Sequence, residues 1–217
     1  MIATLRRFGA IAVAFATAAI ILAAPSKAQD EGATYIFLVT VADRGLNCGL
    51  MADWEVAALL SETDRILLRF GAGDQQALID AATQQAAATP CDDPQINEWI
   101  AGARPGMERE WLPPNLALFR AFAALEAPPQ LFVDIVGDTD LAAAVATIDA
   151  KLDAFEAAGI TAEGERTWDE YIAEVAEVAI DVAAAAGGAT DTDFPPDIAT
   201  EYVIDAGLIT VLWLADQ

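Results

Sequence analysis

Two cysteines, Cys48 and Cys91, place the strongest constraint on how this chain can fold. The sequence holds no third cysteine, and 42 residues lie between the two. In an exported protein, an even cysteine count indicates a disulfide that forms in an oxidising compartment. Closing a loop of this size adds about 4 kcal/mol to the free energy of unfolding in the loop-entropy model. The sequence therefore predicts one structural disulfide that brings these two positions together.

Other chemistries of a cysteine pair fit this chain poorly. A redox-active pair usually occupies a CxxC motif at the start of a helix, and the chain has no such motif. A tetrahedral metal site needs further ligands, but the chain contains neither histidine nor another cysteine to complete it. We therefore interpret the pair as structural.

Residues 1–28 have the three-part pattern of a secretory signal peptide. Arg6 and Arg7 precede an apolar run at 10–24, and Ser26-Lys27-Ala28 follows as a small-residue cleavage site. The run is about 15 residues long, whereas a bilayer span needs about 20. We expect cleavage after Ala28, with an uncleaved anchor as the alternative, and no stable membrane span in the mature protein.

The charge of the mature chain limits its partners. Removing residues 1–28 takes away three of the eleven basic residues and none of the 34 acidic ones, which leaves a net charge of −26. Such a field repels nucleic acid and anionic membranes and attracts cations or basic proteins. Because 55% of the residues are hydrophobic, the charge does not imply disorder. Adaptation of the surface to high salt is an alternative explanation of the charge.

Between the cysteines the apolar spacing predicts three helices. Two of them meet at a hinge near Ser61, and the third covers Gln75 to Ala88, where Thr89-Pro90 ends it. With these bounds the disulfide would join the start of one helix to the end of another. Tyr35–Val41, just before this region, is an apolar run for which we favour helix over strand.

Further along, Asp93-Pro94 predicts the start of a short helix that ends near Gly102. The prolines at 113–114 are expected to separate it from the next amphipathic helix, which covers Leu116 to Leu125. The segment Leu131–Val136 stays open between a short strand and an apolar loop.

The clearest helical patterns lie near the C-terminus. Asp138-Thr139-Asp140 offers caps for a helix over 141–158, and Thr167 with Glu170 forms a capping box for one over 168–186. The last helix, 197–215, is apolar around much of its circumference, which indicates burial in the core. We therefore predict an all-α fold: residues 29–217 form a single disulfide-stapled, acidic domain of about seven or eight helices after the cleaved signal peptide.

The absence of histidine excludes several kinds of catalytic site from this chain. Ser–His–Asp triads, Cys–His pairs and His-ligated metals all need that residue. The sequence also lacks the GxSxG motif, the phosphate-binding glycine loop and the dinucleotide fingerprint. Carboxylate chemistry remains, either as general acid and base or as oxygen ligands for Ca²⁺.

Two groups of aspartates are the candidate calcium ligands. Neither has the glycine and the bidentate glutamate of a calcium loop, so we expect no cofactor unless Ca²⁺ binds there. Turn formation and helix capping are the favoured explanation of aspartates in such positions. The candidates are Asp191, Asp193 and Asp197 in one group and Asp134, Asp138 and Asp140 in the other.

A second candidate site gathers arginines and tryptophans, which commonly anchor binding sites. Such a set could bind an anionic or aromatic ligand or a protein partner. The interpretation that we favour is that the arginines neutralise Glu108, Glu110 and other nearby acids while the tryptophans pack in the core. The members are Trp99, Arg104, Arg109, Trp111 and Arg120.

These features predict an exported protein, periplasmic rather than extracellular, that acts by binding a protein partner or cations and not by catalysis. One alternative is a histidine-free hydrolase, which requires two acidic side chains in one cleft with raised pKa values. Another is an acidic structural protein adapted to salt.

Overall fold

The computed structural model describes residues 31–162, 164–189 and 194–217. The predicted signal peptide and its cleavage site lie outside these residues. Within them every regular element is a helix, apart from one isolated β-bridge between Ala162 and Arg166. The all-α prediction is confirmed.

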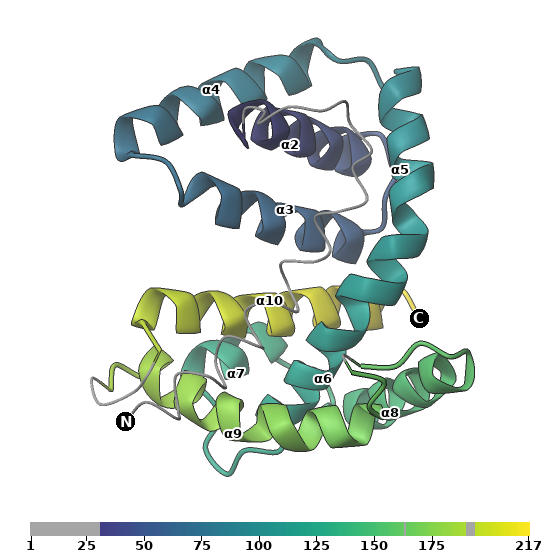
Figure 1. Cartoon of the computed structure of the whole chain (residues 1–217), viewed down its shortest axis with the longest axis vertical. Helices are drawn as coiled ribbons and strands as arrows, with labels where there is room; N and C mark the ends of the chain where they lie inside the picture. The colour runs from purple at the N-terminus through teal and green to yellow at the C-terminus, as the bar shows by residue number, and fades with distance from the viewer. Residues whose placement is uncertain (1–30, 163, 190–193) are drawn as a thin grey trace.

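Three helices form the N-terminal layer, at the top of Figure 1: α2 (Glu31–Asn47), α3 (Asp53–Leu67) and α4 (Ala72–Ala88). α2 packs against both α3 and α4. The helix favoured for Tyr35–Val41 is confirmed as part of α2. The hinge near Ser61 is wrong, because α3 is continuous through this residue and contains neither glycine nor proline.

The disulfide between Cys48 and Cys91 is present. Cys48 follows directly after α2, and Cys91 lies in the turn between α4 and α5. The bond therefore joins the C-terminal ends of two helices, and not a start to an end as predicted. The same two ends are also connected by Arg44, whose side chain donates to the carbonyl of Thr89 over 3.2 Å.

A long rod connects the N-terminal layer to the rest of the molecule. It consists of α5 (Pro94–Gly106), the π-helical turn η2 (Met107–Trp111) and α6 (Leu112–Ala123), which follow one another without a break. Asp93 caps α5 as predicted, accepting from the backbone N–H groups of Gln95 and Ile96.

The predicted end near Gly102 and the predicted break at Pro113 are wrong. Pro113 and Pro114 lie in the first turn of α6, just after the wider π turn, where missing N–H groups disturb the hydrogen bonding least. The rod therefore passes through prolines that a sequence pattern interprets as helix breakers.

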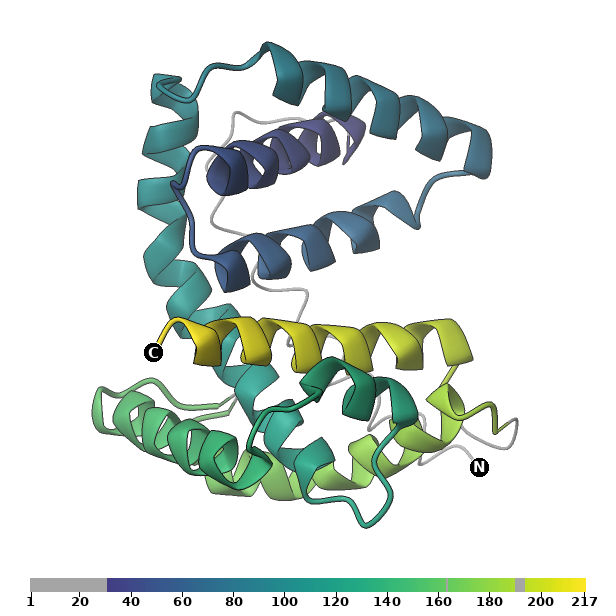
Figure 2. The same cartoon turned by 180° about the vertical axis from the view of Figure 1, so that it is seen from behind.

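The C-terminal layer surrounds α6 with α7 (Gln130–Val136), α8 (Leu141–Ala157), α9 (Trp168–Ala186) and α10 (Pro196–Ala215) (Figure 2). The last three agree with the predicted ranges to within one residue. The segment Leu131–Val136, left open between strand and loop, is part of the helix α7. With the rod counted once, the described residues contain eight separate helical rods, as predicted.

The caps predicted in this layer are confirmed. The Asp140 side chain accepts from the backbone N–H groups of Ala142 and Ala143, and Thr167 with Glu170 forms the capping box of α9.

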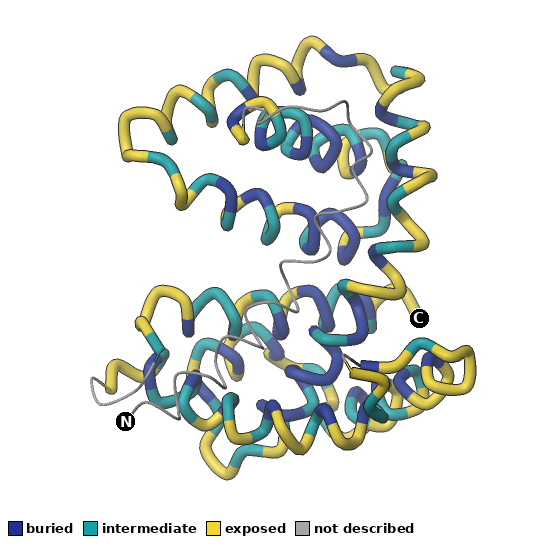
Figure 3. Tube along the Cα trace, in the orientation of Figure 1, coloured by how far each residue is buried: buried dark blue, intermediate teal, exposed yellow. Residues whose placement is uncertain are grey.

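The largest fully buried side chains of this layer lie on α6 and α7. Figure 3 shows the buried stretch of the chain along α6. The Phe132 ring packs 5.0 Å from Phe119 and 5.6 Å from Phe122, measured between ring centroids. α10 is the helix of the C-terminal layer that faces the N-terminal layer: it contacts α3 on one side and α6, α7 and α9 on the other (Figures 1 and 2).

Among the described residues, α10 is the one helix with the length and composition of a membrane span. A core helix of a soluble protein meets the same criteria. α10 carries Glu201 and Asp205 near its middle and packs against four other helices, as a core helix does.

Candidate functional site

The junction between α3 and α10 contains a buried carboxylate that is hydrogen-bonded from the opposite helix. The Ser61 hydroxyl donates to Oδ2 of Asp205 over 2.6 Å, and Nη2 of Arg65 donates to the same oxygen over 2.8 Å. Only 14% of the Asp205 side chain is exposed. Ser61 and Arg65 are one turn apart on α3, so a single face of that helix contacts Asp205.

Three more carboxyl groups lie around this contact. Glu62 and Asp64 are on α3, and Glu201 is one turn before Asp205 on α10. The guanidinium of Arg65 also approaches Glu62, with 3.5 Å between Nη1 and Oε2. We call Glu62, Asp64, Glu201 and Asp205 the junction carboxyls.

Burial is the main cause that raises the pKa of every junction carboxyl. At Asp64 and Glu201 the negative charge of Asp205 raises the pKa further. At Asp205 the hydrogen bond from Ser61 and the charge of Arg65 oppose the effect of burial without cancelling it. Such groups take up protons more readily than exposed carboxylates, so the junction can bind, hold and release protons.

This site was not predicted from the sequence. Ser61 was expected to mark a hinge between two helices, and no spacing pattern connects it to a residue 144 positions away. One signal was available: Glu201 and Asp205 are charged residues in the interior of a helix that is largely apolar. Buried charges in such a helix need partners, and a basic residue on a neighbouring helix is the expected one.

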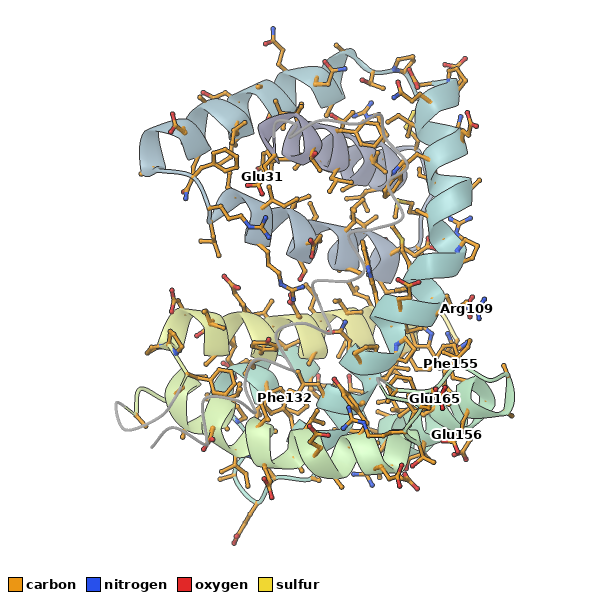
Figure 4. All side chains as sticks on the ribbon, in the orientation of Figure 1. Glu31, Arg109, Phe132, Phe155, Glu156 and Glu165 are labelled. Atoms are coloured by element: carbon orange, nitrogen blue, oxygen red, sulfur yellow. A yellow bond between two sulfur atoms is a disulfide. The ribbon has the colours of Figure 1, made fainter. Side chains whose placement is uncertain are left out.

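The predicted site of arginines and tryptophans does not form one cluster, because its members contact different parts of the fold. Arg104 turns towards α3, whereas Arg120 donates to Asp149 on α8 over 3.1 Å. Trp99 packs edge-on against Phe37, with 5.9 Å between ring centroids, and Trp111 packs against the core. Arg109 is exposed and forms no ion pair with any described residue; Figure 4 shows it on the outer side of the rod.

Arg104 forms the closest of these contacts. Its Nε lies 2.6 Å from Oε1 of Glu55 and its Nη2 lies 3.1 Å from Oε2, while Nη2 also donates to the Leu50 carbonyl. Glu55 is buried, with 4% of its side chain exposed. Hydrogen bonding to the Glu55 carboxylate, which accepts from the guanidinium, raises the pKa of Arg104. The arginine therefore neutralises an internal acid, although not Glu108, whose partner is Lys151.

The candidate calcium ligands are spread over several elements. Asp140 caps α8, and Asp134 accepts a hydrogen bond of 2.8 Å from Gln130. Asp138 is exposed, and Asp197 lies in the first turn of α10. Asp191 and Asp193 are outside the described residues. Within the described part of the chain, no three acidic or cysteine side chains are grouped so that they could hold a metal ion.

Comparisons of the chain with protein-family models, with curated proteins and with solved structures find no match.

Proposed function

We propose that this chain is an exported, non-enzymatic protein, periplasmic rather than extracellular, that binds a positively charged protein partner. The observation that carries the proposal is the internal use of its basic side chains. Of the eight Lys and Arg residues in the described part of the chain, seven form ion pairs with acidic residues of the same chain. These seven are Arg44, Arg65, Arg69, Arg104, Arg120, Lys151 and Arg166.

This pairing leaves a large surplus of carboxylates at the surface. On α9, for example, Glu170, Glu174, Glu177 and Asp181 recur at helical spacing on the face opposite to the buried one. Arg166 pairs with Glu174 on this face. A field of one sign accelerates association with a partner of opposite charge and makes that association sensitive to salt. A cationic protein is the partner that such a surface favours.

Titration calorimetry of the mature protein tests this proposal with octa-arginine as the cationic probe and octa-glutamate as its control. We expect saturable binding of octa-arginine that persists at about 150 mM NaCl and weakens as the salt concentration rises. We expect no heat of binding with octa-glutamate. The proposal is wrong if octa-arginine does not bind at that salt concentration.

Thermal unfolding separates this proposal from the cation and salt alternatives. Stabilisation by millimolar CaCl₂ beyond that of MgCl₂ and NaCl at matched ionic strength would indicate a calcium site, because a ligand of the native state stabilises it. Equal stabilisation by all three salts, together with no binding of octa-arginine, would support an acidic structural protein adapted to salt.

A histidine-free hydrolase is the second candidate function, and the junction carboxyls are the observation that favours it. Several carboxyl groups with raised pKa values at one place resemble the acid and base pairs of hydrolases. A panel of chromogenic esters and glycosides would test it, with Asp205→Asn and Glu201→Gln compared with the unsubstituted protein. Turnover that disappears in both variants while they stay folded would establish the enzyme.

A further inference from the structure

α10 presents apolar side chains to solvent on one side. Ile204 and Leu208, one turn apart, are 37% and 41% exposed. On a helical wheel they point between Asp205, which bonds to α3, and Gly207, which faces α7. A Cβ added to Gly207 would lie 3.0 Å from Cγ2 of Ile135 on α7. Ile204 and Leu208 therefore lie between the directions of two neighbouring helices, α3 and α7. Figure 2 shows α7 in front of α10.

The apolar surface continues onto both neighbours. Leu60 precedes Ser61, the residue that bonds to Asp205, and is 41% exposed. α3 and α10 run in opposite directions (Figure 2). On a helical wheel Leu60 lies just before Ser61, and Ile204 and Leu208 lie to the corresponding side of Asp205, so the three share one side of the contact between antiparallel helices. Ile135 adjoins the strip on α7. We call Leu60, Ile135, Ile204 and Leu208 the apolar strip.

Carboxylates flank the apolar strip, and no basic residue is among its immediate neighbours in sequence. Asp64 is one turn after Leu60 on α3, and Glu201 is close to one turn before Ile204 on α10. The charge of Asp64 contributes to the raised pKa of Glu201 and that of Arg65 opposes it, so Glu201 lies within electrostatic range of both. Asp134, next to Ile135, is exposed on α7.

We propose that the apolar strip is the docking surface for a basic amphipathic helix of the partner protein, with its apolar face on the strip and its Lys or Arg residues against Asp64, Glu201 and Asp134. The inference rests on the proposed function and adds the place and form of binding. Charge complementarity selects this occupant. A second copy of the chain would bring like charges together, and an anionic membrane would be repelled by the same acids. An amphipathic helix satisfies an apolar surface with an acidic rim.

Fluorescence anisotropy tests the inference with a labelled peptide of about 18 residues, built from Leu and Lys at helical spacing. A second peptide has the same composition in a shuffled order that lacks an apolar face. The proteins are the mature chain, Ile204→Gln, Leu208→Gln and, as the matched control, Ile180→Gln. Ile180 is 58% exposed on α9, away from the apolar strip. Circular dichroism checks that each variant is folded.

We expect the ordered peptide to bind the mature chain more tightly than the shuffled one. Ile204→Gln and Leu208→Gln should each raise the Kd by about tenfold, the usual effect of losing an interface anchor. Ile180→Gln should leave the Kd within about twofold of the mature chain, since isolated surface contacts contribute little. Leu60→Gln, on α3, should also raise the Kd. This variant shows that the weaker binding is not caused by a local disturbance of α10.

The two proposals fail in different ways. Equal binding of the ordered peptide by the mature chain and the strip variants would overturn the docking surface and leave the proposed function standing. The same holds if the shuffled peptide binds as tightly as the ordered one. If neither peptide nor octa-arginine binds, both proposals are wrong.

Discussion

Asp205 accepts hydrogen bonds from Ser61 and Arg65 while it is largely shielded from water between two helices. Glu55 has a comparable setting, because it is buried and paired with Arg104. Burial raises the pKa of the Asp205 carboxyl. The negative charge of Glu55, inside the N-terminal layer, is compensated by the guanidinium of Arg104, which contacts both carboxylate oxygens.

The pairing of Glu55 predicts a large effect of Arg104→Ala. The substitution leaves a buried carboxylate without its partner. Because the arginine is partly exposed, we expect the free energy of unfolding to fall by about 2 kcal/mol, less than the usual cost of breaking a fully buried pair. Arg120→Ala is the matched control, since Arg120 and Asp149 are both partly exposed. Arg120→Ala should lower the free energy of unfolding by less than about 1 kcal/mol. Urea unfolding measures both, and equal losses would contradict the assigned role of Glu55.

The junction carboxyls predict an unusual dependence of stability on pH. Their pKa values are higher in the folded than in the unfolded chain, so the folded state takes up protons first as the pH falls. Their contribution to the free energy of unfolding is complete below the unfolded pKa values of about 4 and is lost as the pH rises through the folded values. The Tm should therefore rise on mild acidification from neutral pH.

Asp205→Asn should reduce this rise in Tm, because one of the carboxyl groups with a raised pKa no longer titrates. Asp80→Asn, on the exposed face of α4, removes the same charge away from the junction and should leave the rise unchanged. Thermal melts between neutral pH and about pH 5 measure the difference. Identical pH profiles of the two variants would show that the general charge, and not the junction, determines the slope.

At the scale of helices, close approach between α7 and α10 depends on Gly207. A Cβ there would be 3.0 Å from Cγ2 of Ile135, so Gly207→Ala requires this side chain to give way by a few tenths of an ångström. Gly102, inside α5, has open space around it. Gly102→Ala should stabilise the protein by about 0.5–1 kcal/mol through helix propensity, and Gly207→Ala should gain less or lose stability. Denaturant melts of both variants measure this, and equal gains would contradict the packing of α7 on α10.

Helix positions with strong local signals could be predicted from the sequence. The caps at Asp93, Asp140 and Thr167 mark true helix starts, because capping is decided by residues close in the chain. Pro113 misled the prediction, because a preceding π turn lets the rod continue. The hinge predicted near Ser61 was wrong because the Ser61 hydroxyl bonds to a residue near the other end of the chain. No local pattern indicates such a contact.

At the scale of the whole molecule, two layers are joined by one rod and by the contact of α3 with α10 (Figure 1). The disulfide lies within the N-terminal side of this arrangement, where it joins the ends of α2 and α4. We expect Cys48→Ser with Cys91→Ser to lower the free energy of unfolding by about 2–5 kcal/mol. Amide exchange should show the loss mainly in the N-terminal layer. Uniform loss across both layers would contradict that separation.

Amide hydrogen exchange on the mature chain, with and without the ordered Leu and Lys peptide, tests whether the apolar strip is the docking surface. We predict that the peptide slows exchange in α3, α7 and α10 around Leu60, Ile135 and Leu208, and leaves the outer face of α9 unchanged. Protection spread over all the acidic helices, or confined to α9, would contradict it, because binding would then follow charge alone and not the apolar strip.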